Sequence, residues 1–207
     1  MAAQASPAAG ADRRRVTGVI LAGGLGRRMS TDGQGTDKGL QPFRGRPMVA
    51  HVLERLRPQV DALLINANLS LDRWREFGYP VIPDEIPGHA GPLAGLHAGL
   101  RAAGTPRVVT APCDSPFLPL DLVARLAQAM DASGAEVAVA RTGAQPHPVF
   151  LMADRAVLPS LEAFLASGRR RIDAWYAALR YAEVDFADEA AFRNINTPDD
   201  LRAFEAP

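Results

Sequence analysis

The stretch TGVILAGGLGRRMSTDGQGTDKG, residues Thr17 to Gly39, decides how the rest of the chain is interpreted. It begins with the apolar, β-branched run typical of a buried strand and changes abruptly to glycines between Gly23 and Gly26. Because glycine has no Cβ atom, it lets backbone N–H groups approach a phosphate closely. Arg27, Arg28 and Lys38 would then balance the negative charge of a triphosphate. We therefore predict a strand followed by a glycine loop that binds an anion.

Lys38 is the only lysine in the chain, so the other 22 of the 23 basic residues are arginines. A lone lysine beside a glycine loop indicates that a compact ammonium is needed there, as a point charge on phosphate, instead of a planar guanidinium. The alternative is chance in a chain that is rich in arginine. The neighbouring residues favour the functional interpretation.

Two common phosphate-binding motifs do not fit this stretch, because neither G-x-x-x-x-G-K-[ST] nor G-x-G-x-x-G is present. The stretch instead resembles L-A-G-G-x-x-x-R-M followed by D-K-G, the signature of nucleotidyltransferases that load a nucleotide onto molybdopterin. Leu21 to Gly24, Arg28-Met29 and Asp37 to Gly39 match it in order, and the guanylyltransferase branch is the most similar. One departure is the segment 30–36, which is longer than the usual link in this family.

Length and composition limit the classes of protein to consider. At 207 residues the chain fits one domain, and its formal net charge of zero argues against a broad nucleic-acid surface. Cys113 is the only cysteine, which excludes an internal disulfide and favours the cytoplasm. No apolar run reaches transmembrane length. We expect residues 1–15 to be a disordered lead-in and residues 16–207 to form the nucleotidyltransferase domain.

Polar residues follow two further predicted strands. Asn66 ends the apolar run 60–65, and Asp84 comes shortly after the short run Val81-Ile82. Open α/β sheets bind ligands at the carboxyl ends of their parallel strands, although asparagine is also a common turn residue. The resemblance implies nucleotide binding by residues at these strand ends and in the loops beside them: Leu21, Ala22, Gly23, Gly24, Lys38, Asn66, Asp84 and Asp114.

A third predicted strand, 107–112, runs to Asp114 between two prolines. Transfer chemistry on a nucleoside triphosphate needs Mg²⁺, which one or two carboxylates commonly hold. We therefore predict that Asp114 is the metal ligand, and its P-x-D-x-P context matches the family. The alternative is a helix N-cap, but Asp121 is better placed for that role.

Residues in the C-terminal half of the chain give weaker indications of a binding site for the second substrate. His147-Pro148 matches the family, and a histidine there could bind a phosphate, shuttle a proton or be an ordinary loop residue. The closing segment resembles the family's N-x-N-T-P-x-D-L, in which Thr197 would cap a last helix. The resemblance implies second-substrate contacts by His147, Asn194 and Asn196.

Alternating strands and helices predict an α/β fold, a single three-layer α/β/α domain with a doubly wound, mostly parallel, Rossmann-like sheet. The resemblance implies transfer of GMP from GTP to the terminal phosphate of molybdopterin, with Mg²⁺ as cofactor and pyrophosphate as the leaving group. Lys38, Arg28 and Asp114 would be the catalytic residues. The expected partners are GTP, molybdopterin and molybdoenzymes or cofactor-delivery proteins, without nucleic acid or membrane.

Three alternatives stay open at this point. The cytidylyl branch of the same family reads L-A-A-G, whereas this chain has Gly23 in place of the second alanine, which leaves room for a purine. A sugar-phosphate nucleotidyltransferase would share the fold. A nucleotide-binding regulatory protein without turnover is the alternative of another class, and a chain lacking Asp114 or Lys38 would favour it.

Overall fold

The protein was analysed as a computed structural model that describes residues 15–24, 37–87 and 91–205. Its main sheet has the strand order β5-β4-β1-β6-β8-β7-β9. Strand β8 is antiparallel to both of its neighbours, and the other pairs are parallel. The predicted mostly parallel sheet is confirmed. The strands are β1 (Val16–Leu21), β4 (Ala62–Asn66), β5 (Val81–Ile82), β6 (Arg107–Pro112), β7 (Val137–Thr142), β8 (Gln145–Asp154) and β9 (Tyr181–Asp185).

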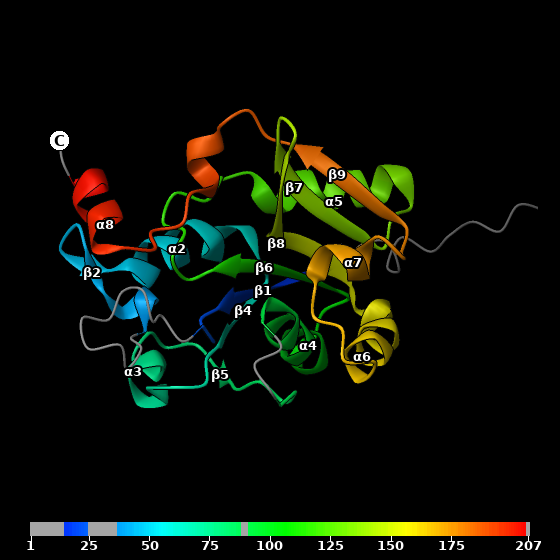
Figure 1. The fold of residues 1–207 in the computed structure, drawn as a ribbon, viewed down its shortest axis with the longest axis horizontal. Coiled ribbons are helices and arrows are strands. Elements are labelled where there is room, and N and C mark those ends of the chain that lie inside the picture. The colour runs from blue at the N-terminus through cyan, green and yellow to red at the C-terminus, as the bar shows by residue number, and fades with distance from the viewer. Residues whose placement is uncertain (1–14, 25–36, 88–90, 206–207) are drawn as a thin grey trace, which may run out of the picture.

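Helices cover both faces of this sheet, which gives the predicted three layers (Figure 1). A small hairpin and several short 3₁₀ turns complete the described structure. The hairpin strands are β2 (Pro42–Phe43) and β3 (Arg46–Pro47). The helices are α2 (Met48–Leu56), α3 (Leu71–Arg75), α4 (Pro92–Ala102), α5 (Leu122–Ser133), α6 (Leu158–Ala166), α7 (Ile172–Tyr176) and α8 (Pro198–Glu205). The 3₁₀ turns are η1 (Lys38–Leu40), η2 (Arg57–Gln59), η3 (Arg155–Val157) and η4 (Glu189–Phe192).

The two-residue period of the central strands divides the hydrophobic core between the two faces of the sheet. Ile20 of β1 and Val109 of β6 pack in the cluster that contains α2 and α5. Their neighbours Val19 and Val108 pack in the cluster that contains α4 and α6. Because both faces are covered, these strands are apolar throughout, as is typical of parallel sheets.

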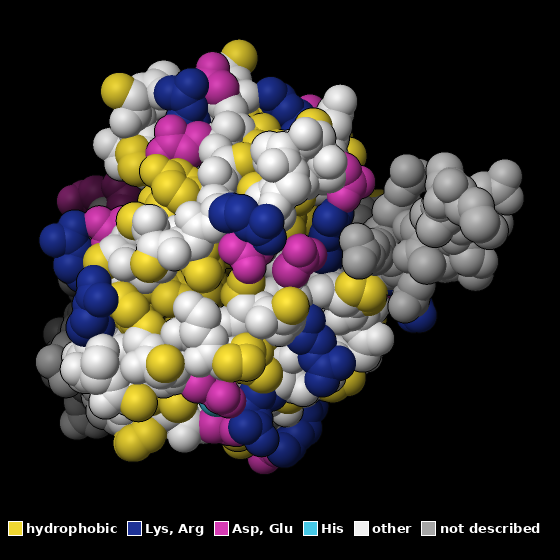
Figure 2. Space-filling view, turned by 90° about the vertical axis from the view of Figure 1, so that its right-hand side faces the viewer, with side chains coloured by type: hydrophobic (Ala, Val, Ile, Leu, Met, Phe, Trp, Pro, Cys, Tyr) yellow, Lys and Arg dark blue, Asp and Glu magenta, His cyan; other side chains and the backbone are white. Residues whose placement is uncertain are grey.

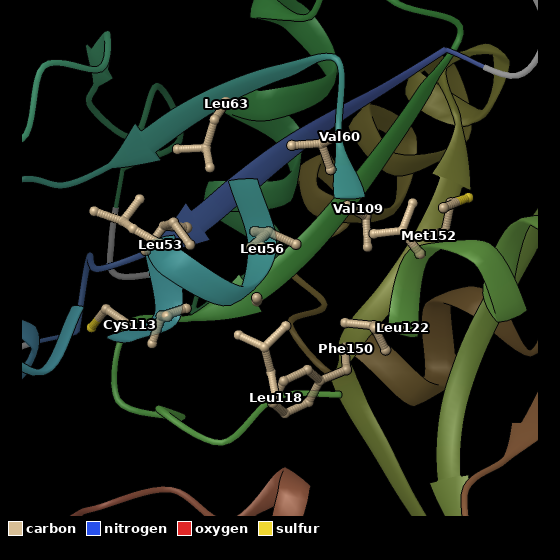
Figure 3. Packing of buried hydrophobic residues seen from close by; sticks show 14 of the residues in the cluster. Leu53, Leu56, Val60, Leu63, Val109, Cys113, Leu118, Leu122, Phe150 and Met152 are labelled. Atoms are coloured by element: carbon tan, nitrogen blue, oxygen red, sulfur yellow. The ribbon is translucent and has the colours of Figure 1, made fainter. Parts of the chain in front are cut away.

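Figure 3 shows part of the first cluster, between the sheet and helices α2 and α5. Leu53 and Leu56 project from α2 toward the sheet, and Leu122 projects from the start of α5. Leu56, Leu118 and Leu122 are fully buried. Cys113 follows β6 directly and belongs to the same cluster. The loop that carries Asp114 is therefore anchored in the hydrophobic core at its first residue.

The start of α5 corrects one prediction. Asp121 occupies the N-cap position, but its side chain makes no capping hydrogen bond. The Val123 N–H instead donates to Gln59 Oε1 at 3.0 Å, 64 residues away in the sequence. Only the fold could bring η2 to this helix start, so the local sequence pattern could not reveal the cap.

The described helices include none that is long and apolar enough to cross a membrane. The parallel strands β1, β4 and β6 all end at the edge of the sheet that lies on the left in Figure 1, near α3 and the hairpin. That edge is where an open α/β sheet binds its ligands.

Candidate active site

Three adjacent strands end in register at one edge of the sheet. Leu21, the last residue of β1, is paired with Asn66 of β4 on one side and with Pro112 of β6 on the other. Asn66 is in turn paired with Ile82 of β5. The predicted site residues that follow these strands are therefore brought to the same edge, and they include Ala22, Gly23, Gly24, Asp84 and Asp114.

Asn66, Asn68 and Asp84 form a hydrogen-bonded platform beside the end of β1. Asn66 Nδ2 donates to Asp84 Oδ1 at 2.9 Å, and Asn68 Nδ2 donates to Asp84 Oδ2 at 2.8 Å. The Asp84 N–H returns a hydrogen bond to Asn68 Oδ1 at 2.8 Å. Both carboxylate oxygens of Asp84 thus have an amide partner, which orients this carboxylate for a polar ligand.

Glycines let neighbouring segments come close to this platform. A Cβ atom at Gly23 would lie 2.9 Å from Asn68 Nδ2 and 3.5 Å from Asp84 Oδ2. A Cβ atom at Gly95 in α4 would lie 2.4 Å from Asn66 Oδ1. These distances are shorter than or at the limit of van der Waals contact, so a larger residue at either position would displace the platform.

Lys38, Asp114 and Asn196 form a second cluster at the same edge. Lys38 Nζ donates to Asn196 Oδ1 at 2.6 Å and lies 3.5 Å from Asp114 Oδ2. The side chain of Asp114 is 10% exposed and that of Lys38 is 21% exposed. The two predicted catalytic residues of the described chain, Lys38 and Asp114, are therefore brought together.

Close packing below Lys38 explains the glycine that follows it. A Cβ atom at Gly39 would lie 2.8 Å from Cys113 Cβ and 2.8 Å from Trp74 Cη2. Trp74 is fully buried, and Cys113 is nearly so. Burial raises the pKa of the Cys113 thiol strongly, which agrees with its interpretation as a small core residue instead of a nucleophile.

The residues before α8 attach to the loop that carries Asp114. Ser115 Oγ donates to Asn194 Oδ1 at 2.7 Å, and the Ile195 N–H donates to the Asp114 carbonyl at 2.9 Å. Ile195 itself is fully buried. Asn194 and Asn196 thus lie at the same edge as Asp114, and both amide oxygens already accept hydrogen bonds from protein groups. Their contacts with the second substrate stay a prediction.

His147 lies in β8, in an environment that restricts its chemistry. Its ring stacks on Phe192 with centroids 4.5 Å apart and an interplanar angle of 7°. Its Nε2 atom lies 2.8 Å from Thr142 Oγ1. Burial lowers the pKa of His147 below 6.5, although Glu189 acts in the opposite direction. The neutral ring is therefore favoured at neutral pH.

The environment of Asp114 suits a hard cation. Burial raises the pKa of its carboxyl above 3.8, and the nearby Lys38 ammonium partly offsets this effect. No group of three or more His, Cys, Asp or Glu residues in the described chain is arranged to hold a metal by itself. Mg²⁺ is usually held by one or two carboxylates, with phosphate oxygens and water as its other ligands. The nearly buried carboxylate of Asp114 is a ligand of the type that this ion uses.

The opposite edge of the sheet, where the parallel strands begin, has a different character. Figure 2 shows basic and acidic side chains interspersed on that side of the molecule. A hollow of about 740 Å³ there is lined by Arg107, Asp131 and Asp154, among other residues. Arg107 is paired with both carboxylates, at 2.7 and 3.0 Å. Because these charges are paired, this hollow is a poorer candidate for a triphosphate.

Three residues at this edge had no predicted site role, and one predicted site residue lies outside the described part of the chain. Arg28 lies outside the described residues, so its predicted phosphate contact stays a prediction. Asn68, Ser115 and Asp200 were assigned no site role from the sequence. Two signals in the sequence mark Asp200: it is the aspartate of the closing N-x-N-T-P-x-D-L motif, and it lies three residues after Thr197, the spacing of a helix capping box.

Comparison with known proteins gives a consistent result. The profile of the MobA-like NTP transferase domain matches residues 18–183. The molybdenum cofactor guanylyltransferase of Cupriavidus taiwanensis is 56% identical over 199 residues, which cover 94% of this chain and 98% of that protein. The protein of the same name from Cupriavidus necator is 54% identical over 198 residues, covering 93% and 98%.

A solved structure supports the same fold. The molybdopterin-guanine dinucleotide biosynthesis protein A from Archaeoglobus fulgidus superimposes with a TM-score of 0.74 at 25% identity. The superposition covers 91% of this chain and 96% of that protein. The agreement therefore extends over nearly the whole length of both chains.

Proposed function

Because the chain belongs to the family of MobA-like NTP transferase domains, we propose that it transfers GMP from GTP to molybdopterin and releases pyrophosphate. The observation that carries this proposal is the Lys38–Asp114–Asn196 cluster, which lies at the same sheet edge as the Asn66–Asp84 platform. The Lys38–Asp114–Asn196 cluster suits charged phosphates, and the Asn66–Asp84 platform suits a nucleoside. We also propose that residues 16–207 form one nucleotidyltransferase domain and that the protein acts in the cytoplasm.

In the proposed reaction, an oxygen of the terminal phosphate of molybdopterin bonds to the α-phosphorus of GTP. The bond from that phosphorus to the oxygen that bridges to the β-phosphate breaks, and pyrophosphate leaves. The attacking oxygen is already anionic, so no strong general base is required. Positioning of the two substrates and neutralisation of their charge would supply most of the rate enhancement.

The described residues divide between the parts of the nucleotide. Leu21, Ala22, Asn66 and Asp84 would line the nucleoside pocket. The amides of Gly23 and Gly24, together with Lys38, would contact the phosphates, and Arg28 is proposed to join them on the basis of the sequence. Asp114 would hold Mg²⁺, which supplies charge stabilisation on the phosphate oxygens when bound. His147, Asn194 and Asn196 are the proposed contacts of the second substrate.

GTP is the proposed donor because Gly23 leaves room next to Asn68 and Asp84. A Cβ atom at this position, such as the alanine of the cytidylyl signature would provide, would press on Asn68. A purine also presents polar edge atoms that amide and carboxylate side chains can pair with, and unpaired polar groups penalise the wrong base.

The experiment is a turnover assay with molybdopterin, Mg²⁺ and GTP, CTP or ATP, in which pyrophosphate and the nucleotide product are measured. We expect product with GTP and loss of turnover in Asp114→Asn. Asp121→Asn is a matched control because Asp121, at the N-cap position of α5, is exposed and makes no capping hydrogen bond. Absence of product with every nucleotide would contradict the proposed activity, whereas a preference for CTP would contradict only the choice of base.

A further inference from the structure

Three consecutive residues before α8 are each tied to the active-site edge. Asn194 accepts from Ser115 Oγ, the Ile195 N–H donates to the Asp114 carbonyl, and Asn196 Oδ1 accepts from Lys38 Nζ. The last of these bonds is short, at 2.6 Å. The direction of the Lys38 ammonium therefore depends on where the backbone of Asn196 lies.

The Asp200 carboxylate accepts hydrogen bonds from that backbone. Its Oδ2 atom accepts the N–H groups of both Asn196 and Thr197, each at 2.9 Å. The Asp200 N–H donates back to Thr197 Oγ1 at 3.1 Å. The bonds between Thr197 and Asp200 form an ordinary capping box. The bond to Asn196 reaches one residue further than a helix cap requires, directly onto the residue that holds Lys38.

Contacts at the other end of α8 keep this helix in place. Arg44 Nη2 donates to the Phe204 carbonyl at 2.8 Å, and the Phe204 ring lies against Phe117 with centroids 5.2 Å apart. Because α8 is held at both ends, its first turn provides a fixed support for Asn196.

The Asp200 carboxylate is charged in this arrangement. The backbone N–H of Asn196 and contacts with Thr197 lower the pKa of Asp200, so its carboxylate is ionised at neutral pH.

We propose that Asp200 is a positioning residue for nucleotidyl transfer, because it fixes the backbone of Asn196 and thereby orients the Lys38 ammonium toward the phosphates. Asp200 acts through Asn196 and does not contact the substrate. This inference rests on the proposed function for its effect on turnover. Its structural part, the restraint on Lys38, can be measured without turnover.

The kinetic test compares Asp200→Ala with Thr197→Ala, because each removes one half of the same capping box. If Asp200 has only a structural role, the two variants should lose stability and activity in parallel. We expect a kcat about 10- to 100-fold lower for Asp200→Ala, since small displacements of positioned groups cost that much. Thr197→Ala should stay within about twofold, and Asp200→Glu should recover part of the loss because glutamate also completes a capping box.

A double variant adds an internal check. If Asp200 acts through Asn196, adding Asp200→Ala to Asn196→Ala should lower kcat no further, because residues that act as a unit are not additive. Multiplicative losses in the double variant would overturn the inference. Equal losses of kcat in Asp200→Ala and Thr197→Ala would also overturn it, and thermal unfolding shows whether each variant is folded.

Because Lys38 is the only lysine, the restraint can also be observed directly. Untagged protein grown with lysine labelled with ¹³C at Cε gives one side-chain signal, whose relaxation reports the mobility of Lys38. We expect a restricted signal in wild type and Thr197→Ala, and a mobile one in Asp200→Ala and Asn196→Ala. A restricted signal in Asp200→Ala would overturn the inference. If wild type shows no turnover of GTP, the proposed function fails, yet this signal still decides whether Asp200 restrains Lys38.

Discussion

The Lys38 ammonium lies 3.5 Å from the Asp114 carboxylate, although 76 positions separate the two residues in the sequence. Each side chain is largely withdrawn from water, so each charge is partly balanced by the other. In the proposed reaction the ammonium would turn to phosphate and the carboxylate to Mg²⁺. The pair therefore holds both groups at the same edge of the sheet before the substrate arrives.

The first prediction is that Asp114→Asn loses turnover by about 100-fold or more, because the amide cannot supply the negative charge that a magnesium site needs. The fold should persist. Burial raises the pKa of Asp114 above 3.8, so the folded state becomes less stable as pH rises from 3.8 through that raised pKa. At neutral pH the amide avoids this cost but deprives Lys38 of its carboxylate partner, so the two effects oppose each other and the variant should remain folded. Near-normal turnover of folded Asp114→Asn at limiting Mg²⁺ would refute the assignment.

The second prediction is that Lys38→Arg does not retain activity, although arginine keeps the charge. Lys38 Nζ is held between Asn196 Oδ1 and Asp114 Oδ2, and a planar guanidinium is bulkier and spreads its donors differently. Consumption of GTP should fall in Lys38→Arg and in Lys38→Ala, with thermal unfolding as the control for folding. Full activity in Lys38→Arg would show that charge alone suffices, and full activity in Lys38→Ala would remove Lys38 from the site.

The parts of the fold that the sequence predicted are those that local patterns specify. The apolar runs of β1 and β6 are long enough to identify as buried strands, and each is followed by a recognisable break in composition. The edge on which Asn66, Asp84 and Asp114 lie then follows from parallel pairing. The family resemblance supplied the roles of these residues, which the strand pattern alone left open.

The features that the sequence did not reveal depend on contacts between distant segments. Asn194 and Ser115 are 79 residues apart, and Lys38 and Asn196 are 158 apart. A pattern within a short stretch of sequence cannot predict hydrogen bonds between residues that are so far apart in the chain. Asn68 is of a residue type that is common in turns. Its hydrogen bonds to Asp84 exist only because β4 and β5 are neighbours.

The third prediction concerns Gly39. A Cβ atom there would lie within 2.8 Å of Cys113 Cβ and of the buried Trp74 ring, and neither group can move freely. Gly39→Ala should lower the free energy of unfolding by about 1–3 kcal/mol through overpacking, and displacement of Lys38 should reduce turnover. Gly104→Ala is the matched control, because a Cβ atom there meets nothing within 4 Å. Denaturant unfolding of both variants is the measurement, and equal stability would contradict the packing argument.

The fourth prediction concerns the choice of base. Gly23→Ala should raise the KM for GTP about tenfold, because the new methyl group would push Asn68 away from Asp84. Asn68 is exposed, so it can move and the protein should remain folded. Gly95→Ala should be more damaging, since its methyl group would meet the buried Asn66. Turnover with GTP and CTP measures both variants, and an unchanged preference and KM in Gly23→Ala would contradict this role of the glycine.

The last prediction separates two roles for His147. Its ring stacks on Phe192, and its Nε2 atom faces Thr142, so we expect it to support the site in the neutral form instead of shuttling a proton. His147→Phe preserves the stacking ring. Its turnover should fall less than about tenfold, because loss of a true general acid–base group costs about 100-fold or more. A larger loss in a folded variant would restore the proton-shuttle interpretation.

The pH dependence of stability gives an independent measure of whether His147 is neutral in the folded protein. Because burial lowers the pKa of His147 below 6.5, the unfolded chain takes up a proton there before the folded chain does as the pH falls. Stability contributed by neutral His147 is therefore present above pH 6.5 and decreases as the pH falls from 6.5 toward the lowered pKa. Wild type should lose more unfolding free energy than His147→Phe between about pH 7.5 and 5.5 in denaturant titrations, since the other histidines are common to both proteins. The same loss in both proteins would mean that His147 titrates normally in the folded state.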